Sequence, residues 1–160
     1  DLEGHANISK QNMEVLDLDD KVLPHIFELS MGIDRSLYSI LEHSFIEDKL
    51  NDRLLLKLKP YLAPIQAGIF PLVTKDGLAE KALSIFTYIK KNLDVVYDES
   101  GSIGRRYRRL DESGVPFGIT IDRQTLEDDT VTVRERDNMQ QIRLKSEEIL
   151  DYLTSAKKID

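Results

Sequence analysis

The chain has 160 residues, of which 41% are apolar, a size and composition that suit one compact domain with an appendage. It contains no cysteine, which excludes disulfides, thiolate metal sites and cysteine nucleophiles, and no apolar run approaches the roughly 20 residues of a membrane span. The formal net charge of −7 argues against sequence-blind binding to nucleic acid, so we expect a cytoplasmic protein without membrane or DNA partners.

The first informative segment leads from an apolar stretch into a helix. Residues 22–29 are largely apolar and strand-like, apart from Pro24, and small residues follow at Ser30 and Gly32. A helix is then expected with Arg35 in its first turn, although the helix dipole favours acids at that place. Apolar residues recur on one face of this helix at helical spacing: Leu37, Ile40, Leu41 and Phe45. An ordinary amphipathic helix with a surface arginine is the alternative interpretation.

Residues 28–35, ELSMGIDR, resemble motif 3 of class II aminoacyl-tRNA synthetases in its glycyl-tRNA synthetase form. The resemblance implies that Arg35 binds the γ-phosphate of ATP, and a planar fork of charged donors suits that role. It also implies that Glu28 and Ser30 line the glycine pocket, with Glu28 holding the substrate ammonium. Without the family, Glu28 is simply an acid at a strand end and Ser30 a turn residue.

Two further motifs of the class II family are absent from the chain. Motif 1 builds the dimer interface, and motif 2 supplies an arginine for the α-phosphate of ATP. Residues 1–5 resemble the stretch just upstream of motif 3, so we expect the C-terminal part of a longer, homodimeric enzyme that uses ATP with magnesium. The fragment alone is expected to bind no cofactor and to activate no glycine. The three histidines are too scattered to form a metal site.

Two prolines, Pro60 and Pro64, mark an expected domain boundary, because residues before proline favour extended or turn geometry. Residues 1–59 are expected to hold a strand–helix remnant of a class II catalytic domain, including motif 3. The charged stretch at residues 47–59 leads out of it. Residues 60–160 are expected to form a second domain with a core of its own.

The second domain alternates between strands and helices. Strands are expected at 66–73, 94–97, 117–121 and 130–134, and helices at 78–93, at 103–110 and after residue 137. Ser102 is placed to cap the middle helix, and Gly114 to close the turn after it. Asp137 with Gln140 resembles a capping box that opens the last helix. The apolar face of that helix would consist of Met139, Ile142, Ile149, Leu150 and Leu153.

This alternation predicts an α/β fold, with a mixed, largely parallel sheet of about five strands flanked by helices. Three of its segments resemble the anticodon-binding domain of glycyl-tRNA synthetases: YDESGSIGRRY at 97–107, PFGITID at 116–122 and TVTVRERD at 130–137. The resemblance implies that residues 60–160 form this domain. It also implies glycine tRNA as a partner, besides glycine and ATP in the full-length enzyme.

The glycine-rich turn that enters the helix at Ile103 suits RNA binding. Such a turn lets backbone N–H groups approach phosphate, and sequence-specific RNA readers work mostly on unstacked bases. By the resemblance, Arg105 is the first choice for a base contact, together with Arg106. They belong to a basic run that also includes Arg108 and Arg109.

Four further residues are candidates for anticodon contact by the same resemblance. Asp122 is placed to accept from a cytosine amino group, and the glycine anticodon carries cytosines at its last two positions. Relatives often have an aromatic residue next, where this chain has Arg123, whose guanidinium plane can stack on a base instead. For Arg134 and Arg136, RNA contact and salt bridges to nearby acids are equal alternatives.

The sequence thus predicts the C-terminal part of a glycyl-tRNA synthetase that recognises the anticodon. Two alternatives are a non-catalytic synthetase-like paralogue and a free-standing tRNA-binding module. The presence of Glu28, Ser30 and Arg35 argues against the paralogue, because a protein without catalysis has no reason to retain substrate contacts. Motifs 1 and 2 upstream in the same reading frame would support the synthetase alone.

Overall fold

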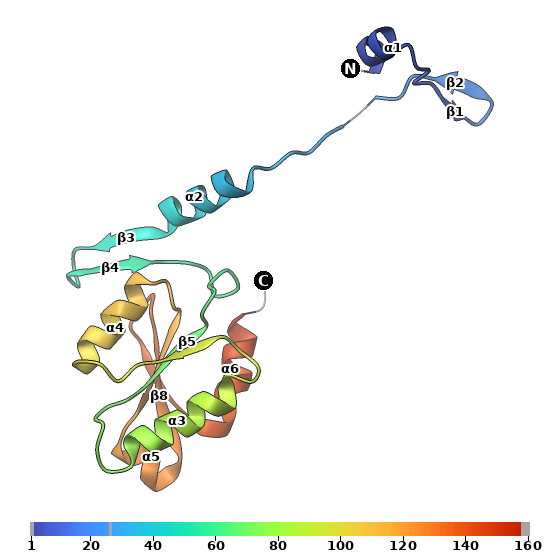
Figure 1. Ribbon diagram of the computed structural model, residues 1–160. Helices are drawn as coiled ribbons and strands as arrows, with labels where there is room; N and C mark the ends of the chain where they lie inside the picture. The colour runs from blue at the N-terminus through green and yellow to red at the C-terminus, as the bar shows by residue number, and fades with distance from the viewer. Residues whose placement is uncertain (1, 26, 158–160) are drawn as a thin grey trace. The chain divides into compact units, whose positions relative to one another are not determined.

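The computed structural model describes residues 2–25 and 27–157 (Figure 1). They fall into two compact units, residues 1–36 and 37–160, and each is described by itself. The first unit contains α1 (Leu2–Ser9) and an antiparallel hairpin of β1 (Val15–Asp17) and β2 (Asp20–Val22).

The strand expected at residues 22–29 is wrong beyond Val22. Residues 23–25 and 27–32 have no regular secondary structure, and Ile26 lies outside the described residues. Pro24 has no N–H to give to a ladder. Phe27 and Leu29 are 91% and 84% exposed, so apolar character here does not mark a buried strand.

The helix expected after Gly32 is confirmed as α2 (Ile33–Ser44), with Arg35 in its first turn. The helix begins where the backbone N–H and hydroxyl of Ser36 both donate to the Gly32 carbonyl at 2.9 Å. It ends one residue before Phe45, which opens the next strand instead of extending the apolar helix face. The division between the two units falls inside α2.

The charged stretch at residues 47–59 lies mostly in a hairpin of the second unit. Strands β3 (Phe45–Asp48) and β4 (Arg53–Leu56) pair antiparallel. The Asp48 side chain closes the turn by accepting from the Asn51 amide group at 2.8 Å. The hairpin belongs to the same compact unit as the sheet described next, although the sequence boundary lies at 59/60. That boundary stays a prediction about family domains.

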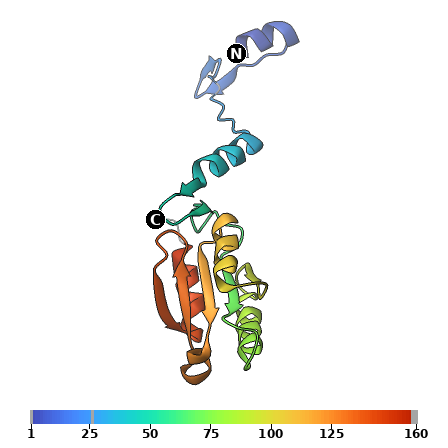
Figure 2. The ribbon, with the colours of Figure 1, turned by 90° about the vertical axis from the view of Figure 1, so that its left-hand side faces the viewer.

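A five-stranded mixed sheet dominates the second unit, and Figure 2 shows its strands side by side. Its spatial order is β6 (Val95–Tyr97), β5 (Ala67–Pro71), β7 (Phe117–Ile121), β8 (Thr130–Glu135) and β9 (Gln141–Lys145). The pairings of β5 with β6 and β7 are parallel, and those of β8 with β7 and β9 are antiparallel. The expected mixed sheet flanked by helices is confirmed, with the parallel pairings confined to β6, β5 and β7.

Helices cover both faces of this sheet, because side chains alternate between the faces along each strand. On β5, Ala67 and Ile69 join a core with α3 (Leu78–Ile89) and α6 (Ile149–Ala156). Phe70 points to the other face and packs with Leu110 of α4 (Ile103–Glu112). The helix expected at 103–110 is confirmed, and that expected at 78–93 is confirmed as far as Ile89, where α3 ends.

The helix expected from Asp137 onward is wrong in its first half. Residues 141–145 form β9, and α6 begins only at Ile149 after a short 3₁₀ turn, η1 (Ser146–Glu148). Ile142 and Leu144 lie opposite Val133 and Val131 of β8, which is a period of two. The seven-residue distance from Ile142 to Ile149 imitates helical spacing across the break.

Candidate nucleic-acid interface

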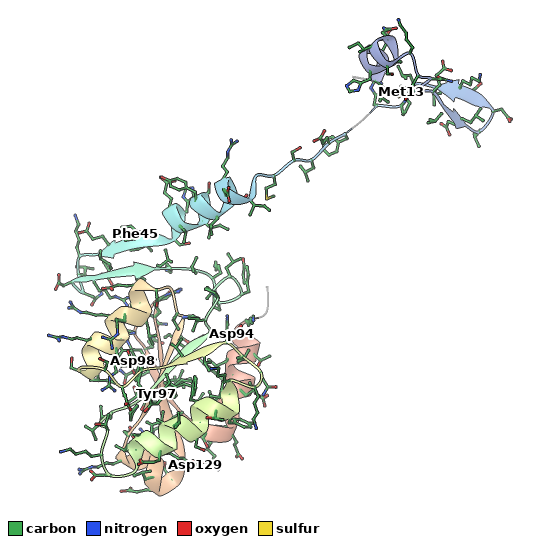
Figure 3. All side chains as sticks on the ribbon, in the orientation of Figure 1. Met13, Phe45, Asp94, Tyr97, Asp98 and Asp129 are labelled. Carbon is green, nitrogen blue, oxygen red and sulfur yellow. The ribbon has the colours of Figure 1, made fainter. Side chains whose placement is uncertain are left out.

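The parallel strands β5, β6 and β7 end at one edge of the sheet. Strands β6 and β7 lie on opposite sides of β5, and this is the arrangement at which α/β sheets bind ligands beyond the strand ends. The chain leaves this edge in loops at 72–77 and 98–102 and enters the short helix α5 (Arg123–Asp128) after β7. Asp98 and Asp129, labelled in Figure 3, follow β6 and α5. We call this edge, with Arg105, Asp122 and Arg123, the carboxyl edge.

A glycine-rich turn brings α4 to the carboxyl edge. Gly101 has a φ of +75°, which favours glycine, and Ser102 occupies the N-cap position without a side-chain capping bond. The first N–H groups of α4 are therefore left without a side-chain cap there. Arg105 is exposed, and its side chain has no hydrogen bond or ion pair within residues 2–25 and 27–157. It is the unengaged cation of this turn.

Arg106, the next residue, is 4% exposed, and its buried side chain stabilises the carboxyl edge through hydrogen bonds. Its guanidinium donates to the carbonyls of Pro71 at 2.5 Å, Gly101 at 2.8 Å and Glu99 at 3.0 Å. It thus ties the turn before α4 to the end of β5. Its buried Nε has no hydrogen-bond partner in the described structure. Contact of Arg106 with RNA stays a prediction, and these bonds give the side chain a structural task.

The other two arginines of the basic run are already paired. Arg109 donates to Asp98 at 2.5 Å and to the Ser100 carbonyl at 2.7 Å. Burial alone would raise the pKa of Asp98, but the hydrogen bonds from Arg109 and from the Ser100 N–H outweigh it and lower the pKa. Arg108 forms a looser, exposed pair with Asp52 at 3.6 Å.

Asp122 is held from two sides at the carboxyl edge. It caps α5 by accepting from the Thr125 N–H at 3.1 Å, and Arg143 of β9 grips its two oxygens at 2.7 and 2.8 Å. The hydrogen bonds from Arg143 are the main reason that the pKa of Asp122 is lowered. Asp122 is therefore an ionised acceptor near neutral pH, with 22% of its side chain exposed.

Sequence reasoning missed α5 and Arg143. The signal for α5 was present, since Asp122 and Thr125 are spaced for reciprocal capping. Arg143 was missed because its segment was expected to be helical.

Arg123 is the most open of the candidates at this edge. Its side chain is 80% exposed, and within the described residues it bonds only Asp76, at 3.3 Å, in the loop after β5. Exposed ion pairs of this kind contribute little, so the guanidinium is available for another partner.

Arg134 and Arg136 are buried, at 8% and 2% exposure. Arg134 bonds both oxygens of Asp111, at 3.0 and 3.1 Å. Arg136 bonds Asp137 at 2.8 Å and the carbonyls of Gly114 and Leu58 at 2.8 and 2.6 Å. Salt bridging to nearby acids therefore occurs for both, and their contact with RNA stays a prediction.

The motif 3 residues lie in the first unit. Ser30 donates its hydroxyl to Glu28 at 2.8 Å, and both side chains are exposed. Arg35 is exposed on α2, and no bond within the described residues joins it to either of them.

Within residues 2–25 and 27–157, no cluster of three or more His, Asp or Glu side chains is placed to hold a metal ion. Nor is any helix there long and apolar enough to cross a membrane.

Comparison with known proteins identifies relatives. The chain is 53% identical over 135 residues to a glycine–tRNA ligase of Methanocaldococcus jannaschii, covering 84% of this chain and 23% of that protein. For the glycine–tRNA ligases of Methanothrix thermoacetophila and Clostridium acetobutylicum, identity is 47% and 43%, with 91% and 96% of this chain covered. The chain spans 26% and 34% of those two proteins, so it corresponds to about a quarter to a third of these relatives.

A family model also matches residues 66–156, more than half of the chain and the whole of the five-stranded sheet. That model describes the anticodon binding domain, and the chain therefore belongs to this family.

Proposed function

We propose that this chain is the anticodon-recognising part of a glycine–tRNA ligase and that its RNA partner is glycine tRNA. The family match and the 53% identical ligase support the class of partner. The carboxyl edge carries the proposal, because it gathers an unengaged arginine, a fixed carboxylate and an open guanidinium around one end of a sheet.

Each of these groups fits one part of single-stranded RNA recognition. Arg105, beside the uncapped start of α4, is suited to a phosphate or to the acceptor atoms of a base edge. Arg123 offers a plane on which a base can stack. Asp122 accepts hydrogen bonds, which suits the amino group of cytosine. Since the net charge is −7, a few such anchors must supply the affinity.

We infer for the whole ligase that glycine and ATP, with magnesium, first form glycyl-adenylate and pyrophosphate, and that the glycyl group then moves to the tRNA. In this scheme Arg35 binds the γ-phosphate of ATP, and Glu28 and Ser30 bind glycine. The assembly would be a homodimer through motif 1. The relatives reported above are named ligases, which supports this scheme over a paralogue or a free-standing module.

The test measures binding of labelled anticodon stem-loop RNA to the purified chain. We expect the glycine stem-loop to bind more tightly than one whose two anticodon cytosines are replaced. Arg105→Ala should weaken glycine stem-loop binding by about 1–3 kcal/mol, the range for one good base contact. The matched control is Arg108→Ala on the same helix, which removes an exposed ion pair with Asp52. It should weaken the binding of every stem-loop by less than Arg105→Ala weakens glycine stem-loop binding.

Equal binding of all stem-loops by the wild-type chain would refute the proposed function. Unchanged selectivity in Arg105→Ala would instead move the site away from the start of α4.

A further inference from the structure

Every N–H group of the Arg143 guanidinium, on β9, donates a hydrogen bond. Nε donates to the Thr130 hydroxyl at 2.6 Å, and the two terminal nitrogens donate to Asp122, to the Thr132 hydroxyl and to the Thr130 carbonyl. A guanidinium has five N–H donors, and five bonds are present here. Arg143 therefore has no donor left for a ligand, although 29% of its side chain is exposed.

The two oxygens of Asp122 differ in what they accept. Oδ1 accepts from Arg143 at 2.7 Å, from the Thr125 N–H at 3.1 Å and from the Thr125 hydroxyl at 3.3 Å. Oδ2 accepts only from Arg143, at 2.8 Å, within the described residues. Since a carboxylate oxygen offers about two lone pairs, Oδ2 keeps one acceptor position open.

We propose that Arg143 is a positioning residue that sets base specificity at the carboxyl edge. By bonding both oxygens of Asp122, it fixes a carboxylate that can accept one further hydrogen bond at Oδ2, while its own N–H groups are all used. The pair selects a nucleobase amino group and rejects a keto oxygen at the same place. This inference rests on the proposed function and names how its site discriminates.

The discrimination follows from hydrogen-bond chemistry. Cytosine presents an amino donor where uracil presents a carbonyl acceptor. An acceptor placed against the Asp122 carboxylate makes no bond and repels it. The saturated Arg143 cannot turn to donate instead. A hydrogen bond to a charged group amounts to about tenfold in affinity or more, so a preference of that size for cytosine is expected.

The experiment measures binding of the 160-residue chain to glycine anticodon stem-loops that differ only by cytosine or uracil at one of the last two anticodon positions. The key variant is Asp122→Asn, because asparagine is as good an N-cap as aspartate and keeps α5 closed. Its amide can donate or accept, so the cytosine preference at one position should fall from about tenfold to nearly none.

Arg143→Gln should lose the same preference, while Arg143→Lys, which keeps the charge without the bidentate grip, should retain part of it. The matched control is Arg123→Gln at the same edge, since it removes only an exposed pair with Asp76. It should weaken binding to all stem-loops alike. Thermal unfolding of each variant reports whether the fold is kept.

The outcomes separate this inference from the function beneath it. A wild-type chain that ignores the anticodon overturns the proposed function and the inference together. A wild-type chain that prefers cytosine, with the same preference in Asp122→Asn, overturns the inference alone. If Arg143→Gln fails to fold, the Asp122→Asn and Arg143→Lys results still decide whether the Arg143–Asp122 pair sets the base preference.

Discussion

Arg53 of the β3–β4 hairpin donates to Asp111 of α4 at 2.9 Å, across 58 residues of sequence. Both side chains are nearly inaccessible to solvent, at 6% and 3% exposure. The same carboxylate also accepts hydrogen bonds from both terminal nitrogens of Arg134 on β8. The Arg134 guanidinium lies 4.7 Å from the centre of the Tyr107 ring. One aspartate thus fastens the hairpin, α4 and the sheet to one another.

Replacing that aspartate should therefore destabilise the second unit strongly. In Asp111→Asn, the buried Arg134 loses its carboxylate partner and Arg53 keeps only Asp48, and breaking a buried pair in this way typically costs about 3–5 kcal/mol. Urea unfolding followed by circular dichroism measures the change. The control is Asp52→Asn, which breaks an exposed pair between the same hairpin and α4 and should cost less than about 1 kcal/mol. Similar losses in the two variants would contradict the role given to Asp111.

Gly118 on β7 is expected to tolerate no side chain. A Cβ built there would lie 2.5 Å from Cε1 of Tyr107 and 3.3 Å from Phe70. The Tyr107 ring cannot move away freely, because its hydroxyl bonds the Thr120 hydroxyl at 2.7 Å. Gly118→Ala should lower the free energy of unfolding by about 1–3 kcal/mol through overpacking.

The control is Gly104→Ala on α4, where a Cβ would meet nothing within 4 Å. It should raise stability by up to about 1 kcal/mol, the difference in helix propensity. Thermal unfolding of both variants tests the pair, and a stabilising Gly118→Ala would show that α4 packs less closely on the sheet.

Much of the second unit could be predicted because its patterns are local. Strand β5 is a short buried apolar run, and α3 repeats apolar residues every three or four positions between recognisable ends. The C-terminal hairpin strand β9 could not be separated from a helix, because Ile142 lies two residues before Leu144, which suits a strand, and seven before Ile149, which suits a helix. The choice between strand and helix for residues 141–145 depends on their pairing with β8, which requires that the sheet has already formed.

The site was predicted in part for a similar reason. Arg105 followed from the glycine turn and the charge run, and it is exposed as expected. That Arg106 is buried could have been inferred, since it stands three residues after Ile103 and four before Leu110 on the apolar face of α4. The partnership of Asp111 with Arg53 and Arg134 joins distant segments, and no local pattern indicates it.

Acid should destabilise the protein partly through aspartates near the carboxyl edge. Hydrogen bonds from Thr130, then from Gln124, lower the pKa of Asp128 to about 2, and Arg143 lowers that of Asp122. A lowered folded-state pKa means stability that is fully present above the unfolded value of about 4 and is lost as pH falls toward 2.

Asp128→Asn keeps an acceptor for Thr130 but no longer titrates. Its melting temperature should therefore fall less than that of the wild type between pH 7 and pH 3. An identical fall in both proteins would mean that Asp128 has no part in the acid transition.

Arg35 should matter for activity and not for folding. Its side chain is exposed on the first turn of α2 and has no hydrogen bond or ion pair within the described residues, so Arg35→Ala should leave the melting temperature nearly unchanged. In the full-length ligase, the same change should remove charge-assisted bonds to ATP, each about 1.5–3 kcal/mol, and slow glycine-dependent ATP–pyrophosphate exchange by one to two decades. Arg35→Lys should recover only part of the rate, because an ammonium cannot reproduce the planar fork. The 160-residue chain alone should show no exchange above a blank. An Arg35→Ala ligase with wild-type exchange kinetics would remove this residue from the ATP site, while the anticodon proposal would stand on its own test.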